Sequence, residues 1–128
     1  MPVFRIYVEK KPEFAVEAKS CLNDLKTALR VEGIEDVRIL NRYDAEKLSE
    51  EDFRLAVPTV FSEPAVDRVY SELPETAEDE RVFAVEYLPG QFDQRADSCS
   101  QCIQILTQCE SSVIRNGRIY IIKGNVSL

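Results

Sequence analysis

The chain has 128 residues, 45% of them hydrophobic, so it is large enough to bury a core as one domain. Its net charge is -7 and its basic residues are scattered, which argues against a nucleic-acid partner. It has no histidine, which excludes imidazole-based catalysis and metal binding. Neither a membrane-spanning stretch nor a signal peptide is visible in the sequence, so we expect a cytoplasmic protein that does not interact with membranes.

The first part of the chain predicts a strand, a helix and a second strand. Residues 4–9 alternate between apolar and polar side chains, which is the pattern of a half-buried strand. Pro12 suits the first turn of a helix. The expected apolar face of that helix consists of Phe14, Ala18, Cys21, Leu22, Leu25 and Leu29. After Gly33, residues 37–43 predict the second strand.

Residues 44–81 predict a less regular connecting segment. Ser49 is placed to cap a short helix that ends before Pro58, and residues 59–61 predict a short strand. Residues 71–80 are acidic and contain a proline, which favours an exposed connection without a binding role.

From residue 82 the opening pattern returns. Residues 82–88 predict a strand, residues 93–108 a helix, and residues 118–123 the closing strand. The expected apolar face of this second helix consists of Phe92, Ala96, Cys99, Ile103 and Leu106. Asn116-Gly117 fits either a hairpin turn or a bulge within one long strand.

The two units also match residue by residue, which we interpret as an internal duplication with repeats at about residues 3–43 and 82–123. The matched pairs are Val8 and Val85, Glu9 and Glu86, Pro12 and Pro89, then, after a one-residue insertion, Phe14 and Phe92, Ala18 and Ala96, Ser20 and Ser98, Cys21 and Cys99. Two such units can share one antiparallel sheet with both helices on one face. The predicted fold is therefore α+β, in the manner of a fused pseudo-twofold dimer of a smaller protein.

Several segments carry a resemblance to a known family. Residues 85–98, VEYLPGQFDQRADS, and residues 101–104, QCIQ, closely resemble the amino-terminal region of long, single-chain phosphoribosylformylglycinamidine synthases. Residues 4–12 and 38–43 also resemble that family, so the resemblance covers nearly the whole chain. It is most specific at residues 88–98, because no rule for helices or strands requires that mixture of side chains.

The resemblance implies a domain without catalytic groups. In that family the amino-terminal domain is similar to a dimer of the small subunit found in multi-component versions, and it contacts the synthase and glutaminase domains. The parent ligase uses ATP, magnesium and glutamine to convert formylglycinamide ribonucleotide into formylglycinamidine ribonucleotide in purine biosynthesis. This chain has neither a phosphate-binding glycine loop nor the histidine of a glutaminase, so we expect it to be inactive alone, to bind no cofactor and to be truncated from a much longer enzyme.

Two other functions fit the same sequence pattern. A free-standing regulatory module that binds a small molecule could share this architecture, because one fold can host many functions. The chain could also be a separate small synthase subunit, although its duplication already supplies what a dimer would supply. For the same reason we expect the chain to be predominantly monomeric.

The candidate contact with the other domains of the parent lies around the start of the second predicted helix. Its polar residues alternate with apolar ones and are expected to point toward solvent: Gln91, Asp93, Gln94, Arg95, Asp97 and Ser98. We expect Arg95 to anchor the contact on carboxylate or backbone oxygens, with the two glutamines completing a polar seal around an ammonia route. The alternative is that Asp93 only caps the helix and the others form its wet face.

The four cysteines are Cys21, Cys99, Cys102 and Cys109. The Cys99-Ser-Gln-Cys102 spacing fits half of a zinc or redox site, but Cys99 occupies the same position on its helix as Cys21 on the first. We therefore interpret all four as reduced, buried side chains. No catalytic and no metal-binding residue is predicted.

Overall fold

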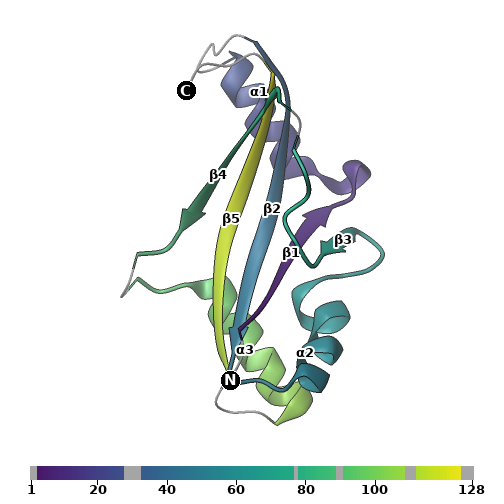
Figure 1. Ribbon diagram of the computed structural model, residues 1–128, viewed down its shortest axis with the longest axis vertical. Coiled ribbons are helices and arrows are strands. Elements are labelled where there is room, and N and C mark those ends of the chain that lie inside the picture. The colour runs from purple at the N-terminus through teal and green to yellow at the C-terminus, as the bar shows by residue number, and fades with distance from the viewer. Residues whose placement is uncertain (1–2, 28–32, 77, 89–90, 109–111, 125–128) are drawn as a thin grey trace.

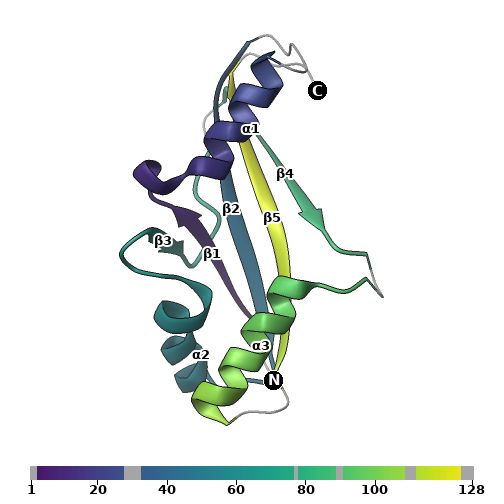
Figure 2. The same cartoon turned by 180° about the vertical axis from the view of Figure 1, so that it is seen from behind.

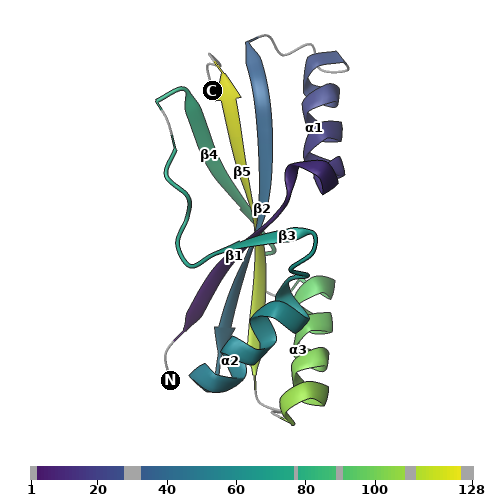
Figure 3. The same cartoon turned by 90° about the vertical axis from the view of Figure 1, so that its right-hand side faces the viewer.

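The computed structural model describes residues 3–27, 33–76, 78–88, 91–108 and 112–124. These residues form a five-stranded antiparallel sheet in the order β3-β1-β2-β5-β4. Three α-helices lie on one face of the sheet (Figures 1 and 3), which confirms the predicted α+β class. The strands are β1 (Phe4–Lys10), β2 (Ile34–Glu46), β3 (Asp67–Tyr70), β4 (Glu80–Glu86) and β5 (Val113–Gly124). The helices are α1 (Val16–Thr27), α2 (Glu50–Ala56) and α3 (Gln94–Thr107).

The long strands β2 and β5 form the centre of the sheet, and the pairing around them is symmetric. Asn41 of β2 lies opposite Arg118 of β5. The same two residues lie opposite Val8 of β1 and Val85 of β4, which are the matched valines of the two sequence units. Helices α1 and α3 lie toward opposite ends of the central strands (Figure 2). The segment from β1 to β2 and the segment from β4 to β5 are therefore arranged alike about the Asn41–Arg118 pair.

The helices differ in how deeply they are buried. Helix α3 buries Ala96, Cys99 and Ile103 in a cluster that includes Val8 and Tyr43 of the sheet. Helix α1 buries Ala18 and packs half-buried apolar side chains, among them Cys21, Leu22 and Leu25, beside a smaller cluster. The larger buried cluster thus lies at the α3 end of the sheet. Because burial of apolar surface is the main favourable term in folding, this end contributes more to stability than the α1 end.

The opposite face of the sheet is also buried at its centre. Side chains alternate along a strand, so Leu40 and Tyr43 of β2 lie on opposite faces. Leu40 clusters with Tyr7, Ile119 and Ile121, all of them buried. The connection from β3 to β4 crosses this face of the sheet (Figure 3). Its described residues are mostly exposed, as expected of an acidic connection.

Two aromatic residues predicted to pack on the sheet do not do so. Phe92 precedes α3, which begins at Gln94, and its side chain is 71% exposed. Phe14 belongs to a 3-10 turn ahead of α1 and is 44% exposed. The prediction was wrong for both because the helical period was extended beyond the residues that are helical. Leu106, at the end of α3, is also exposed, and Leu29 lies outside the described residues.

The connecting segment confirms one prediction and contradicts another. Ser49 caps α2, because its Oγ accepts a hydrogen bond from the Asp52 amide at 3.1 Å. The strand predicted at residues 59–61 is absent, since a π-helical turn, Val57–Phe61, follows α2 and buries Phe61. The prediction also missed β3, whose four residues are too short for a clear alternating pattern.

Asn116-Gly117 forms neither of the two structures expected for it. Both residues lie inside β5, and their pairing with Tyr43 and Arg42 of β2 continues without a shift. A hairpin turn or a bulge would interrupt that register. A turn or bulge therefore does not explain the glycine at residue 117, and the explanation comes from the side chains that pack next to it.

The burial of α3 gives a testable difference between two isoleucines. Ile103 is fully buried, whereas Ile105 on the same helix is 83% exposed. Replacing Ile103 by Ala should lower the free energy of unfolding by about 2–5 kcal/mol, because it leaves a cavity. Replacing Ile105 by Ala should change it by less than about 0.5 kcal/mol. Urea unfolding measures both, and similar losses would contradict the packing described here.

Candidate functional site

A groove of about 790 Å³ lies beside the start of α3 and along β4 and β5. We call it the α3 groove. Its lining residues are Val85, Glu86, Tyr87, Gln91, Gln94, Arg95, Ser98, Asn116, Gly117, Arg118 and Tyr120. Four of the six candidate contact residues, Gln91, Gln94, Arg95 and Ser98, therefore lie together here, beside residues of two neighbouring strands. Asp93 and Asp97 do not line the groove.

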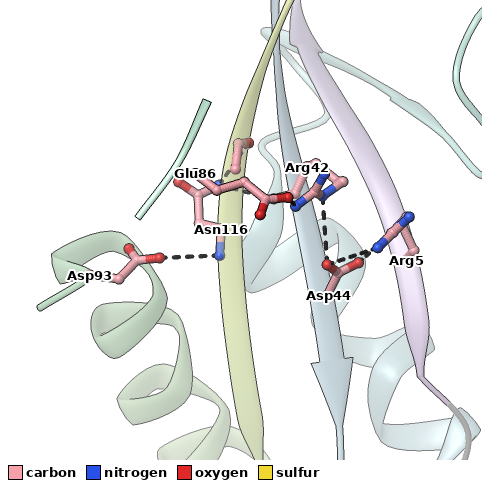
Figure 4. Close-up of polar contacts among 7 residues, drawn as sticks. Arg5, Arg42, Asp44, Glu86, Asp93 and Asn116 are labelled. Carbon is pink, nitrogen blue, oxygen red and sulfur yellow. Dashed lines mark hydrogen bonds and ion pairs between the residues drawn. The ribbon is translucent and has the colours of Figure 1, made fainter. Parts of the chain in front are cut away.

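Asp93 fixes the start of α3. Its Oδ1 accepts a hydrogen bond from the Ala96 amide at 3.0 Å, which confirms that it caps the helix. Its Oδ2 accepts a second bond, at 3.2 Å, from the backbone amide of Asn116 in β5 (Figure 4). One carboxylate thus ties the helix start to the sheet. Asp97 accepts from Gln101 on the next turn of the helix at 2.8 Å, so it too interacts locally.

Arg95 is exposed, as predicted, but its guanidinium also reaches the core. Its Nη1 lies 3.5 Å from the hydroxyl of Tyr43, which is a long and weak hydrogen bond. Burial raises the pKa of Tyr43, and the positive charge of Arg95 acts in the opposite direction. Among the described residues Arg95 has no ion pair. Since a guanidinium carries five donors, most of its capacity is open to a partner.

The β4 side of the groove is apolar and exposed. Val85 and Tyr87 are each about half exposed, at 52% and 53%. Phe83 stacks on Tyr120 of β5 with ring centroids 5.2 Å apart, and it is also exposed. Leu88 and Phe92, which follow β4 in the chain, are exposed apolar side chains as well. The groove therefore combines polar groups from α3 with an uncovered apolar margin from β4.

On the other face of the sheet a chain of charged side chains links β1, β2 and β4 and crosses β5 at Gly117, which explains why residue 117 is a glycine. Arg42 of β2 reaches across β5 and donates to Glu86 of β4 (Figure 4). Both residues lie opposite Gly117 in the strand register, so the contact passes over this glycine. Its Nε lies 3.5 Å from Asp44, which accepts two hydrogen bonds from Arg5 of β1. A Cβ on residue 117 would lie 3.0 Å from Arg42 Nη2 and 3.3 Å from Glu86 Cγ. The glycine leaves the space through which the arginine crosses the strand.

The cysteines differ in exposure. Cys99 is buried, Cys21 is half-buried and Cys102 is exposed, so the prediction of a buried side chain was wrong for Cys102. Cys109 lies outside the described residues. Burial raises the pKa of the Cys99 thiol to about 11, so this thiol stays protonated near neutral pH. The described residues hold no group of three or more histidine, cysteine or acidic side chains placed to bind a metal ion.

Comparison with family models, with curated proteins and with solved structures finds no match to this chain. The resemblance noted for residues 85–98 therefore remains a prediction. None of the helices in the described ranges is long and apolar enough to cross a membrane.

The crossing of β5 by Arg42 can be tested at Gly117. Valine is intrinsically favoured over glycine in a strand, so a stability loss on Gly117→Val would report the clash with Arg42 and Glu86. We expect a loss of about 1–3 kcal/mol in the free energy of unfolding. In an Arg42→Ala background the same replacement should cost much less. Equal costs in the two backgrounds, measured by urea unfolding, would show that Arg42 is not the obstacle.

Proposed function

We propose that this chain is the non-catalytic amino-terminal domain of a phosphoribosylformylglycinamidine synthase. In this proposal the α3 groove docks on the synthase and glutaminase domains of the same parent chain and helps couple their reactions. The observation that carries the docking role is the guanidinium of Arg95, which has no ion pair in the described residues and lies in a groove bordered by exposed apolar side chains.

We further propose that the two sequence units arose by duplication of a smaller protein that formed a dimer. The strand registers support this, because the matched residues Val8 and Val85 lie opposite Asn41 and Arg118, which pair with each other. A twofold axis through that pair would exchange the two halves. Such an isologous arrangement is what the fusion of a symmetric dimer would produce.

The composition of the groove suits recognition of another protein surface. Arg95 can donate two parallel hydrogen bonds to a carboxylate, and Gln91, Gln94 and Ser98 can both donate and accept. The exposed margin at Val85 and Tyr87 supplies apolar area that a partner would cover. Interfaces commonly combine an apolar centre that includes aromatic and arginine side chains with a polar rim.

The structure also suggests why this contact could act on coupling rather than on the fold of the domain. The helix start is already fixed by Asp93, through Ala96 and Asn116. The side chains of Gln94 and Arg95 are consequently not needed to hold the helix start, whereas the Gln91 Oε1 accepts a hydrogen bond from the Leu88 amide at 2.7 Å and keeps its amide group as a donor. In the parent they would close a polar seal around the route along which ammonia passes from the glutaminase to the synthase.

Replacing Arg95 by Ala in the full-length enzyme tests the coupling role. We expect glutamine-dependent synthesis to fall by about tenfold, the effect of losing one well-placed interface contact, while synthesis driven by added ammonia changes little. The melting temperature of the chain alone should stay nearly unchanged, because the bond to Tyr43 is long and weak.

Arg54→Ala is the matched control, since Arg54 is an exposed arginine of α2 that pairs only with Glu50 of its own helix in the described residues. It should leave both activities unchanged. Equal losses with glutamine and with ammonia in Arg95→Ala would exclude a specific coupling role. A large drop in melting temperature would show that Arg95 serves the local fold.

A further inference from the structure

The outer strands β1 and β4 of the symmetric part of the sheet differ in whether another strand covers their outer edge. The outer edge of β1 is covered by β3, which pairs with it in antiparallel fashion. In the part of the chain that the structure describes, no strand pairs with the outer edge of β4. All but one of the residues of β4 are exposed, including Val82, Phe83 and Val85. An unpaired strand edge with apolar side chains can pair with a strand of another chain, so proteins usually cover or charge such edges.

The covering of β1 shows what kind of segment this edge accepts. Val69 of β3 lies opposite Val8, and Arg68 lies opposite Glu9. Glu9 also accepts a hydrogen bond from the hydroxyl of Tyr70 at 3.1 Å. At these two positions the covering strand thus places an apolar side chain opposite Val8 on the helix face and a basic one opposite Glu9 on the other face.

The chain just before β3 covers a second surface. Phe61, from the π-helical turn, packs against Tyr43 with ring centroids 4.9 Å apart. Tyr43 lies opposite Ile6 of β1, and in the other half Tyr120 lies opposite Phe83 of β4. Tyr43 is buried, whereas Tyr120 is only partly buried and borders the α3 groove. Among the described residues, the β4 half therefore has neither a covering strand nor an aromatic side chain equivalent to Phe61.

We propose that the outer edge of β4 binds an extended segment of a partner polypeptide, antiparallel to β4 and in the register that β3 has on β1. The segment would place an apolar side chain opposite Val85 and a basic one opposite Glu86, and a bulky apolar side chain ahead of the strand would enter the α3 groove. This inference deepens the docking role and rests on it, but it does not depend on which enzyme the parent is.

Charge favours a basic partner over a second copy of this chain. The chain carries a net charge of -7, and the connection leading into β4 contains Glu72, Glu75, Glu78 and Asp79. If β4 paired with its own copy along its full length, the strands would be centred on Phe83. Glu80 would then face Glu86 of the other copy, twice in the dimer. Like charges directly opposite each other destabilise a strand pair. The Glu86 side chain is 55% exposed beside Arg42, so it can accept another cation.

The probe for the experiment is a peptide of residues 61–70, the covering segment of β1, with Asp67→Lys. On β1 the new lysine would face Lys10, whereas Asp67 forms an ion pair with Lys10 at 3.0 Å. On β4 the same register would place it near Tyr87, which tolerates a cation. The change therefore directs the peptide to the open edge. Amide shifts of the isotope-labelled 128-residue chain would locate the binding.

We expect saturable shifts along β4 and at Tyr120. Val85→Lys should weaken binding by about tenfold or more, since a lysine on an edge strand opposes pairing. Ile105→Lys is the matched control, because Ile105 is an exposed apolar residue on α3 away from this edge, and it should leave the affinity unchanged. A peptide that also carries Arg68→Glu should bind more weakly, because its acid would face Glu86.

Shifts confined to β1 and β3, or no saturable shifts, would overturn the proposal. Equal weakening by Val85→Lys and Ile105→Lys would also overturn it. Self-association of the chain that Val85→Lys abolishes would assign the edge to a second copy instead. Peptide binding together with equal losses of glutamine and ammonia activity in Arg95→Ala would leave the strand site standing and reject the coupling role.

Discussion

The antiparallel pairing of β2 with β5 positions the rest of the molecule. These two strands run side by side from Ile34 and Gly124 to Glu46 and Val113, and each carries an outer strand at its other edge. Because the register places Asn41 opposite Arg118, α1 and α3 are held at opposite ends of one face. A slip of one residue in this pairing would turn the side chains of one strand to the opposite face from their partners on the other strand. The charged contact from Arg42 of β2 to Glu86 of β4 crosses β5 at residue 117, where a glycine leaves room for it.

The two halves of the fold, one built on β1 and the other on β4, differ in how far their outer edges are covered. In the first half, the segment from α2 to β3 covers the edge of β1 and buries Phe61 against Tyr43. In the second half, no described segment covers the corresponding edge and groove, which present Val85, Tyr120 and the charge of Arg95. Burying apolar surface stabilises a protein, so leaving this surface open is costly unless a partner covers it. This difference is the reason for proposing that the second half, rather than the first, docks on a partner.

The sequence predicted the elements with strong periodicity and missed those set by tertiary contacts. Helix α3 and its cap at Asp93 could be recognised because the cap is a local hydrogen bond. Phe92 was predicted to be buried because it fits the apolar period of α3, but the helix begins only at Gln94 and Phe92 is exposed. The apolar period alone does not show at which residue a helix begins. The strand β3 could not be predicted, since its four residues are fixed by their pairing with β1 rather than by a pattern of their own. The glycine at residue 117 is visible in the sequence as a special position. The reason for it could not be predicted, because Arg42, which passes over it, is distant in sequence.

Amide hydrogen exchange tests most directly the claim that the open half is a docking surface. The measurement compares the amides of β4 and of the start of α3 in this chain alone with the same amides in the intact parent enzyme. We predict that they exchange markedly more slowly in the parent, while the amides around Ile105 at the far end of α3 exchange at similar rates in both. Equal exchange of β4 in the chain and in the parent would contradict the account, because a covered edge must protect its outward amides.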